Sequence, residues 1–521
     1  MTVVTPLRPK WAPALARALL LAVMPSFLSD LMNPERRRRS PRLHPTSYLD
    51  GLRGLAACAV FAYHYTDYNH KPLLPHYGNN PNDMGSSYMQ LPYIRLIYSG
   101  TPMVHIFFVI SGFALSSRPL RTLYSSCSPS GAPDAGAIAK CNSILSSSAL
   151  RRPFRLFIPP MMSTLLTAAI VQLGYMNKFM QPQETVRQQL IHWWDDVFHR
   201  ITYPWAWDEG SPKSGYNPHL WTIPMEFVHS MFLFLMILVA SRLRSTYVRQ
   251  AFFVVMMVIV LWNGRWAAFE FLGGALLADI YHYEQQSEPK DPEKEGGLIT
   301  PLSNGCPSPT TSYAPGSGSL GRSIPLVWSG LVDAFRILVL LGAGFILSWP
   351  PRGGDMTETY TWIQSLAPET MVQDKPDRGK NFWLAIAAFS TVWAAGRIAL
   401  FKRVLNSGVA QYAGKISFCF YILQHPILNL MQHHTLGAQA KPANGDKPAE
   451  APWGVRGMTG IETPFQRTIC WLIGLMIMGS VLVWLADLFT RIVDTPAVKF
   501  ARWVENILVV KEDTREQATQ K

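Results

Sequence analysis

The sequence is poor in cysteine and offers no pattern of metal ligands. Six cysteines occur in 521 residues, and none of them forms a CxxC pair or another spacing typical of a metal site. Cys58, Cys419 and Cys470 lie in apolar runs, where a cysteine packs as a small hydrophobic residue. Cys127 and Cys141 fall in a segment that we expect to face the cytosol, where disulfides are rare. We therefore expect neither a bound metal nor a disulfide scaffold.

Signatures of several enzyme classes are missing as well. No G-x-S-x-G elbow surrounds Ser111, so this serine is not expected to be a nucleophile. The segment 192-HWWDD-196 matches the H-x(3)-D signature of soluble CoA-dependent acyltransferases, but their second signature, DFGWG, does not occur. No histidine begins the H-x(4)-D motif of glycerolipid acyltransferases. The chain therefore matches neither of these two classes.

Acidic residues are scarce relative to basic ones. The chain has 34 Asp and Glu against 47 Lys and Arg, which gives a net charge of +13. No nucleic-acid-reading module accompanies this charge, so we expect no nucleic-acid partner. Membrane proteins concentrate Lys and Arg on their cytosolic side, and the cluster 36-RRRR-39 directly precedes a long apolar run. We interpret the excess positive charge as a topology signal.

Long apolar runs are abundant. Hydrophobic residues make up 48% of the chain. They gather in runs of roughly 18–25 residues, the length that crosses a bilayer. We predict an all-α fold, a polytopic integral membrane helix bundle of about ten transmembrane helices in the lipid bilayer of an endomembrane or the plasma membrane. The expected spans are residues 50–67, 98–116, 154–176, 219–241, 248–263, 266–283, 325–348, 381–401, 411–432 and 467–490.

Basic residues near the ends of these runs assign sides to the connecting segments. The segments expected to be cytosolic carry Arg36 to Arg39, Arg118, Arg121, Arg151, Arg152, Arg155, Arg242, Arg244, Arg249, Arg397, Lys402, Arg403, Arg491, Lys499 and Arg502. Both termini are then predicted to be cytosolic.

Composition divides the chain into three parts. Residues 1–45 form a basic N-terminal segment whose run 11–31 lacks a convincing cleavage site, so we expect an amphipathic segment that lies on the membrane surface. Residues 46–500 form the transmembrane domain, and residues 501–521 a polar cytosolic tail. Within the domain, the Pro-, Ser- and Gly-rich stretch 285–323 is predicted to be a disordered cytosolic insert.

Arg53 and His64 are unusual residues for an apolar helix. Eleven steps of an α-helix make three turns plus about 20°, so the two side chains share one face roughly 16 Å apart. A polar group within a membrane usually faces a bundle interior or a watery cavity. Alternatively, Arg53 snorkels to lipid headgroups and His64 makes a structural hydrogen bond between helices. Their shared face favours a functional pair.

A second polar set lies at the start of the run 216-YNPHLWTIPMEFVHSMF-232. Glu226 and His229 are three residues apart and are expected on one helix face. A carboxylate ahead of a long apolar run is costly unless it is paired or hydrated, so Glu226 is a functional candidate. Trp221 is either a substrate contact or an anchor at the membrane interface.

Three further features complete the candidate set. Ser111 either takes part in a site or bonds a backbone carbonyl. Arg152 and Arg155, at helical spacing, either belong to a positive-inside belt or clamp a phosphorylated cofactor. His425 precedes Pro426 and either contributes to the site or satisfies the carbonyl that proline frees. Intramembrane histidines with cytosolic arginines suit a general base and an anionic cofactor.

Together these stretches resemble the membrane-bound acyltransferase family 3, in its fungal branch. The motifs are LDGLRGLAA at 49–57, FFVISGF at 107–113, RRPFRLFIPP at 151–160, HLWTIPMEF at 219–227, GKISFCFYILQHPI at 414–427 and DTP at 494–496. Their order covers the chain from about residue 46 to about residue 500. One departure is His105, which stands where many members carry an acid or a small residue.

The resemblance implies transfer of an acyl group, most often acetyl, from acyl-CoA to a hydroxyl of a small molecule such as a secondary metabolite or carbohydrate. Under it, His64 is the general base, with Arg53 and Glu226 as further catalytic residues. We expect Arg53, Arg152, Arg155 and Ser111 to bind the acyl-CoA co-substrate, and Trp221, His229, His425 and His105 to contact the acceptor. Asp67 either orients the His64 ring or is an interfacial loop acid. We expect no required protein partner.

A different class remains open. A transporter or lipid-handling membrane protein with this scaffold would use the buried histidines and Glu226 as proton relays or substrate contacts. The other large membrane O-acyltransferase family also has an intramembrane histidine, but the residues around His64 match family 3. The requirement for His64 in acyl-CoA consumption separates the enzyme from the transporter.

Overall fold

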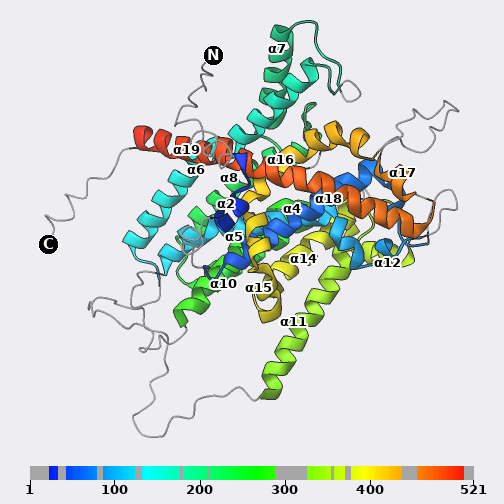
Figure 1. Cartoon of the computed structure of the whole chain (residues 1–521). Coiled ribbons are helices and arrows are strands. Elements are labelled where there is room, and N and C mark those ends of the chain that lie inside the picture. Colours follow the sequence, from blue (N-terminus) through cyan, green and yellow to red (C-terminus); the bar gives the residue numbers. More distant parts are fainter. Residues whose placement is uncertain are drawn as a thin grey trace, which may run out of the picture.

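The computed structural model describes residues 23–32, 43–78, 86–124, 132–176, 180–208, 210–287, 326–353, 357–369, 377–436, 454–460 and 462–509. Within these ranges the chain forms helices and no β-strand, which confirms the all-α prediction (Figure 1). The long helices are α4 (Ser47–Asn69), α5 (Gly100–Leu123), α6 (Ala135–Gln172), α8 (Thr222–Ala240), α9 (Thr246–Trp262), α10 (Trp266–Ser287), α11 (Leu326–Leu347), α14 (Asp377–Ala395), α16 (Gly408–Leu436), α18 (Pro464–Phe489) and α19 (Thr495–Leu508).

Shorter helices connect these elements. They are α2 (Ser26–Met32), η1 (Lys71–Leu73), η3 (Tyr88–Gln90), η4 (Ile94–Tyr98), α7 (Val186–Asp196), η5 (Val197–Ile201), η6 (Pro218–Trp221), α12 (Glu358–Ser365), α15 (Ala399–Leu405), α17 (Val455–Thr459) and η9 (Thr490–Asp494). Helices η5 and η9 are short π-helical turns that continue α7 and α18.

Five helical segments of the described chain are long and apolar enough to cross a membrane, and a sixth is possible if one bent pair forms a single span. The five are Gly100–Leu123, Ala135–Gln172, Pro218–Ala240, Gly330–Leu347 and Pro464–Leu508. Large apolar side chains face outward on α11, such as Leu331, Phe335 and Leu338, as expected for contact with lipid. These features indicate a membrane protein.

Helices coincide with all ten expected spans, but ten crossings do not follow. Helices α4, α10 and α16 are not apolar enough to be counted as membrane spans, and α9 is too short. The expected span 381–401 is wrong as a single helix, because its two parts, Gly379–Ala395 and Ala399–Leu405, are bent by 94°. The number of ten and the cytosolic position of both termini stay predictions.

Close helix contacts at glycine build the centre of the bundle. Helix α4 packs against α5 and α16, and α5 packs against α10. A Cβ atom on Gly54 of α4 would lie 2.4 Å from the backbone nitrogen of Gly414 on α16. A Cβ atom on Gly112 of α5 would lie 2.3 Å from the Phe271 carbonyl oxygen on α10. Because glycine has no side chain, these backbones can touch.

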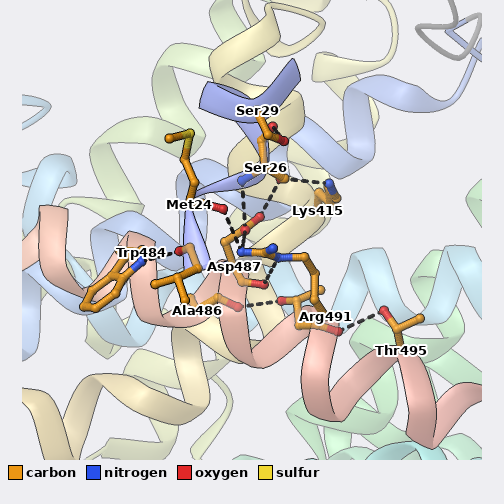
Figure 2. Close-up of polar contacts among 11 residues, drawn as sticks. Met24, Ser26, Ser29, Lys415, Trp484, Ala486, Asp487, Arg491 and Thr495 are labelled. Carbon is orange, nitrogen blue, oxygen red and sulfur yellow. Dashed lines mark hydrogen bonds and ion pairs between the residues drawn. The ribbon is translucent and has the colours of Figure 1, made fainter. Parts of the chain in front are cut away.

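The N-terminal segment is attached to α18 through a buried carboxylate (Figure 2). Asp487 is 1% exposed and accepts hydrogen bonds from the backbone nitrogen (3.0 Å) and hydroxyl (2.6 Å) of Ser26. Arg491, one turn later, pairs with Asp487 at 2.9 Å and donates to the Met24 carbonyl at 2.9 Å. The short helix α2 therefore rests on the bundle itself.

The predicted domain boundaries are only partly covered by the structure. The cluster 36–39 and most of the segments 1–45 and 285–323 lie outside the described residues. Residues 285–287 complete α10, and α19 runs across the predicted boundary at residue 500 as far as Leu508. The interfacial segment, the disordered insert and the polar tail stay predictions.

Candidate active site

A cavity of about 290 Å³ lies between helices α4, α5, α6, α8 and α16. Five of the residues that the sequence singled out line it: Arg53, Ser111, Arg152, Arg155 and Glu226. These residues come from four helices that are far apart in the chain, so the fold brings the separate motifs to one place. Apolar side chains, among them Val104, Phe107 and Phe418, form much of the remaining wall.

Arg152 and Glu226 form an ion pair across the cavity. The Arg152 guanidinium lies 2.6 Å from Glu226 Oε1, and its Nε donates to the Ser230 hydroxyl at 3.1 Å. The Ser111 hydroxyl donates to the same carboxylate oxygen at 3.3 Å. The costly Glu226 carboxylate is thus compensated by charge and hydrogen bonds. Ser111 meets this carboxylate rather than the backbone carbonyl offered as the alternative.

Arg53 is directed toward α16. Its Nε donates to the Ser417 hydroxyl at 3.1 Å, and its Nη2 donates to the Gly414 carbonyl at 3.0 Å. Asp50, one turn earlier on α4, lies 3.1 Å from the same guanidinium. The short approach of α4 to α16 at Gly54 and Gly414 makes these bonds possible. Arg53 is therefore held at the cavity wall.

Two charged residues that sequence reasoning did not select also line the cavity. Lys415 follows Gly414 on α16, and Asp494 ends the π-helical turn η9. Pro496 has no backbone N–H for a helical bond, and the Thr495 N–H bonds the Thr490 carbonyl across a wider turn. Both residues belong to motifs that the sequence shows, GKI and DTP. The described lining thus holds four basic side chains and two carboxylates.

Three histidines from three helices gather next to this cavity. The rings of His64 (α4) and His219 (η6) are stacked, with 3.5 Å between centroids and 14° between planes. The His425 ring (α16) meets His219 edge-on at 4.7 Å and 76°. Tyr68 Oη lies 3.2 Å from His425 Nδ1. His64 and His425 were candidates from the sequence, whereas His219, the first residue of HLWTIPMEF, was missed.

Tyr421 connects the histidine cluster to the cavity. It lines the cavity, and its hydroxyl donates to the His219 carbonyl and lies 2.7 Å from the Thr222 hydroxyl, which also lines the cavity. Arg53 and His64 lie eleven residues apart in the uninterrupted helix α4, which is consistent with the predicted shared face. Arg53 contacts α16 through Gly414 and Ser417, and His64 stacks on His219, which in turn meets His425 of α16. The cavity and the histidines therefore form one continuous polar region.

The remaining predicted residues lie elsewhere. His105 is fully buried and its Nδ1 lies 2.5 Å from Glu270 Oε1. His229 is fully buried, with its Nδ1 2.8 Å from the Met225 carbonyl, and it packs against aromatic rings. Trp221 is partly buried against the main core. None of the three is part of the cavity lining, so their acceptor contacts stay predictions.

Two secondary expectations are decided by contacts. The Asp67 carboxylate lies 2.8 Å from Arg352, which fits the interfacial acid rather than the partner of His64. The carbonyl that Pro426 frees belongs to Ile422, and it accepts from the side chains of Asn217 at 2.9 Å and Ser163 at 3.4 Å rather than from His425. His425 is instead in contact with Tyr68 and Asn429. In the part of the chain that the structure describes, no three potential ligands converge as a metal site.

Known proteins are similar to this chain over most of its length. A family model described as an acyltransferase domain matches residues 46–488. O-acetyltransferase PaAT-1 of Phomopsis amygdali is 28% identical over 92% of this chain and 88% of its own.

Two further fungal relatives are more distant. Acyltransferase R4 of Phoma sp. (strain ATCC 20986 / MF5453) is 25% identical, and acyltransferase clz18 of Cochliobolus lunatus is 23% identical, each over 73% of this chain and 81% of its own. No solved structure matches significantly. Because the family model spans most of the sequence, the chain belongs to the acyltransferase 3 family and is an acyltransferase.

Proposed function

We propose that the protein is an integral membrane O-acyltransferase that transfers an acyl group, acetyl in the first instance, from acyl-CoA to a hydroxyl of a secondary metabolite or a carbohydrate. The observation that carries this proposal is a cavity rich in basic residues, next to three histidines that include His64. The relatives support it, because one is named an O-acetyltransferase and two are named acyltransferases.

The basic residues account for recognition of the donor. Acyl-CoA carries several phosphates, and arginine binds phosphate oxygens through paired N–H donors. Arg155 and Lys415 are exposed and line the cavity, and Lys415 donates a hydrogen bond to the Ser26 hydroxyl at 3.1 Å. Arg152 is engaged by the Glu226 carboxylate and Arg53 by α16. We assign the phosphate contacts to Arg155 and Lys415, with Arg53 and Arg152 as fixed positive charges behind them. Ser111 supports this set through Glu226.

His64 accounts for the chemistry. As general base it takes the proton of the acceptor hydroxyl while the hydroxyl oxygen attacks the thioester carbonyl. The carbon–sulfur bond then breaks, the ester forms, and the proton held by His64 passes to the departing thiolate, which leaves as the free thiol. Neither a covalent acyl-enzyme nor a redox change is needed. In this scheme His425 contacts the acceptor from α16.

Labelled acetyl-CoA tests the proposal. Microsomes with matched amounts of the native protein, His64→Ala or His199→Ala receive labelled acetyl-CoA and a host extract, and all labelled products are profiled. His199 is an exposed histidine paired with Asp195, so its variant is the matched control. We expect a labelled product with the native protein and with His199→Ala, but not with His64→Ala.

The same assay decides against the proposal if the patterns agree. Identical label patterns in all samples, across several acyl chain lengths and with a competent extract, would exclude the base role of His64. The transporter or lipid-handling function would then become the leading hypothesis. If His199→Ala also lost the product, the loss in His64→Ala would reflect misfolded protein rather than a missing base.

A further inference from the structure

Helix α16 carries an interruption that reaches the histidine cluster. Pro426 lies inside this helix and has no backbone N–H, so the carbonyl of Ile422, four residues earlier, lacks its helical donor. Ile422 is fully buried, and a buried carbonyl without a donor costs roughly 1–3 kcal/mol. The structure supplies donors from other parts of the chain: the side-chain amide of Asn217 at 2.9 Å and, at longer range, the Ser163 hydroxyl at 3.4 Å.

Asn217 uses both ends of its side chain. Its Nδ2 donates to Ile422, and its Oδ1 accepts from the backbone nitrogen of His219 at 3.2 Å, which caps η6. The residue is fully buried. It therefore joins the interrupted helix to the backbone of His219 through a single rigid group.

The loop before Asn217 is held in place independently. The Ser214 hydroxyl and the Gly215 backbone nitrogen bond the Asp196 carboxylate at 2.5 Å and 2.7 Å. The Tyr216 hydroxyl lies 2.5 Å from Gln189 Nε2 and 2.7 Å from His192 Nδ1. Burial raises the pKa of Tyr216 to about 12, so this hydroxyl stays neutral. Asn217 thus enters the bundle from a fixed base.

Apart from the bond between Asn217 and the His219 backbone, few contacts hold the His219 ring in place. Its carbonyl accepts from Tyr421, but its Nδ1 is buried with no hydrogen-bond partner among the described residues. Its face lies on His64 at 3.5 Å, and His425 closes its edge. Asp67, the nearest acid on α4, is bound to Arg352. The His64 ring is therefore contacted by the His219 ring, whereas many catalytic histidines are contacted by a carboxylate.

We propose that Asn217 and His219 are positioning residues for His64: the amide of Asn217, locked to the carbonyl that Pro426 frees, places the His219 ring as a flat support that orients the His64 imidazole. Two imidazoles stacked this closely cannot both be in the cationic form without strong repulsion. His219 then serves as a neutral surface, and His64 accepts the acceptor's proton.

Labelling of His64 with diethyl pyrocarbonate tests this proposal without any transferase assay. The rate of His64 modification is followed by mass spectrometry of its peptide in the native protein, Asn217→Ala, His219→Ala and His219→Phe. A released imidazole exposes its nitrogens, so we expect a several-fold faster rate in the two alanine variants. His219→Phe keeps a flat ring on His64 and is expected to label at the native rate. His199 of the same samples is the internal reference.

Kinetics provide the second arm, which rests on the function proposed above. A small displacement of a catalytic group costs up to roughly 100-fold in rate. We expect Asn217→Ala and His219→Ala to lower kcat by about 10- to 100-fold with the KM for acyl-CoA unchanged, and His219→Phe to restore most of kcat. A merely structural role would lower the amount of folded protein and leave kcat per folded molecule intact.

The outcomes separate the two hypotheses. Unchanged labelling of His64 in Asn217→Ala and His219→Ala overturns the positioning role whether or not the protein transfers acetyl groups. Equal loss of kcat in His219→Phe and His219→Ala also overturns it, because the nitrogens of His219 would then be required. Altered labelling in a protein without transferase activity supports the positioning role and refutes the proposed function. Thermal unfolding in detergent confirms that each variant is folded.

Discussion

The Arg152 guanidinium and the Glu226 carboxylate lie 2.6 Å apart and join α6 to α8 across the candidate active site. Their side chains are 12% and 22% exposed, so water screens this pair only in part. The pair makes the two residues dependent on each other. Removal of one partner should therefore destabilise the folded protein more than removal of both.

Glu226→Ala should destabilise the protein, because Arg152 then faces the cavity without its counter-charge. A double-mutant cycle with Arg152→Ala is expected to give a coupling energy of roughly 1–3 kcal/mol in unfolding in detergent. Glu226→Gln keeps hydrogen-bond capacity and should lie between the native protein and Glu226→Ala. Additive effects of the two alanine substitutions would show that the ion pair has no energetic role.

Arg155→Ala and Lys415→Ala should weaken binding of acyl-CoA. For the loss of one phosphate contact we expect the KM for acyl-CoA to rise about tenfold, which is equivalent to about 1.4 kcal/mol, with kcat largely retained. Arg265→Ala is the matched control, since this exposed arginine pairs with Asp208 outside the cavity. A KM that responds equally to all three substitutions, or to none, would contradict the assignment of these two residues.

Gly54→Ala should disrupt the packing of α4 on α16. The added Cβ would lie 2.4 Å from a backbone atom of α16, and a rigid backbone cannot give way as a side chain can. Overpacking of this kind costs typically about 1–3 kcal/mol and occasionally more. Gly342→Ala is the control, because its Cβ would meet no atom within 4 Å. We expect a lower midpoint of thermal unfolding in detergent for Gly54→Ala alone.

Asp487→Ala should release the N-terminal segment from α18. Both Ser26 donors and the Arg491 guanidinium would lose their acceptor. Limited proteolysis is expected to cleave the region around residues 23–32 faster, while Asp333→Ala, which removes an exposed carboxylate of α11, leaves the rate unchanged. Equal cleavage of the native protein and Asp487→Ala would show that the segment is held by its apolar contacts, such as Phe27 against Tyr412.

The sequence predicted the helices, and it singled out five of the residues that line the candidate cavity, for a different physical reason. Apolar runs identify helices because lipid and core demand the same side chains, but they do not determine how often a chain crosses a membrane. Arg152, Arg155 and Glu226 stood out because charge is costly in such runs. Their convergence with Arg53 and Ser111 in one cavity is a property of the tertiary packing.

What the sequence did not indicate depends on contacts between distant segments. His219 lies before an apolar run rather than inside it, so the sequence did not mark it as a costly buried residue. Only the fold places its ring on His64. The link from Asn217 to Ile422 joins residues 205 positions apart. His105 and His229 were also expected to contact the acceptor, yet each is enclosed by its own structural partners.

The hydrogen bonds between Ser26 and Asp487 affect how chimeras of related acyltransferases should be built. The family match begins at residue 46, whereas Asp487, inside that match, takes two hydrogen bonds from a residue twenty positions before it begins. The same Ser26 hydroxyl accepts a hydrogen bond from Lys415, which lines the cavity. A chimera cut before residue 46 would therefore deprive a buried acid of the two donors of Ser26 and free a lysine at the ligand site. The N-terminal segment should travel with the domain when specificities are recombined.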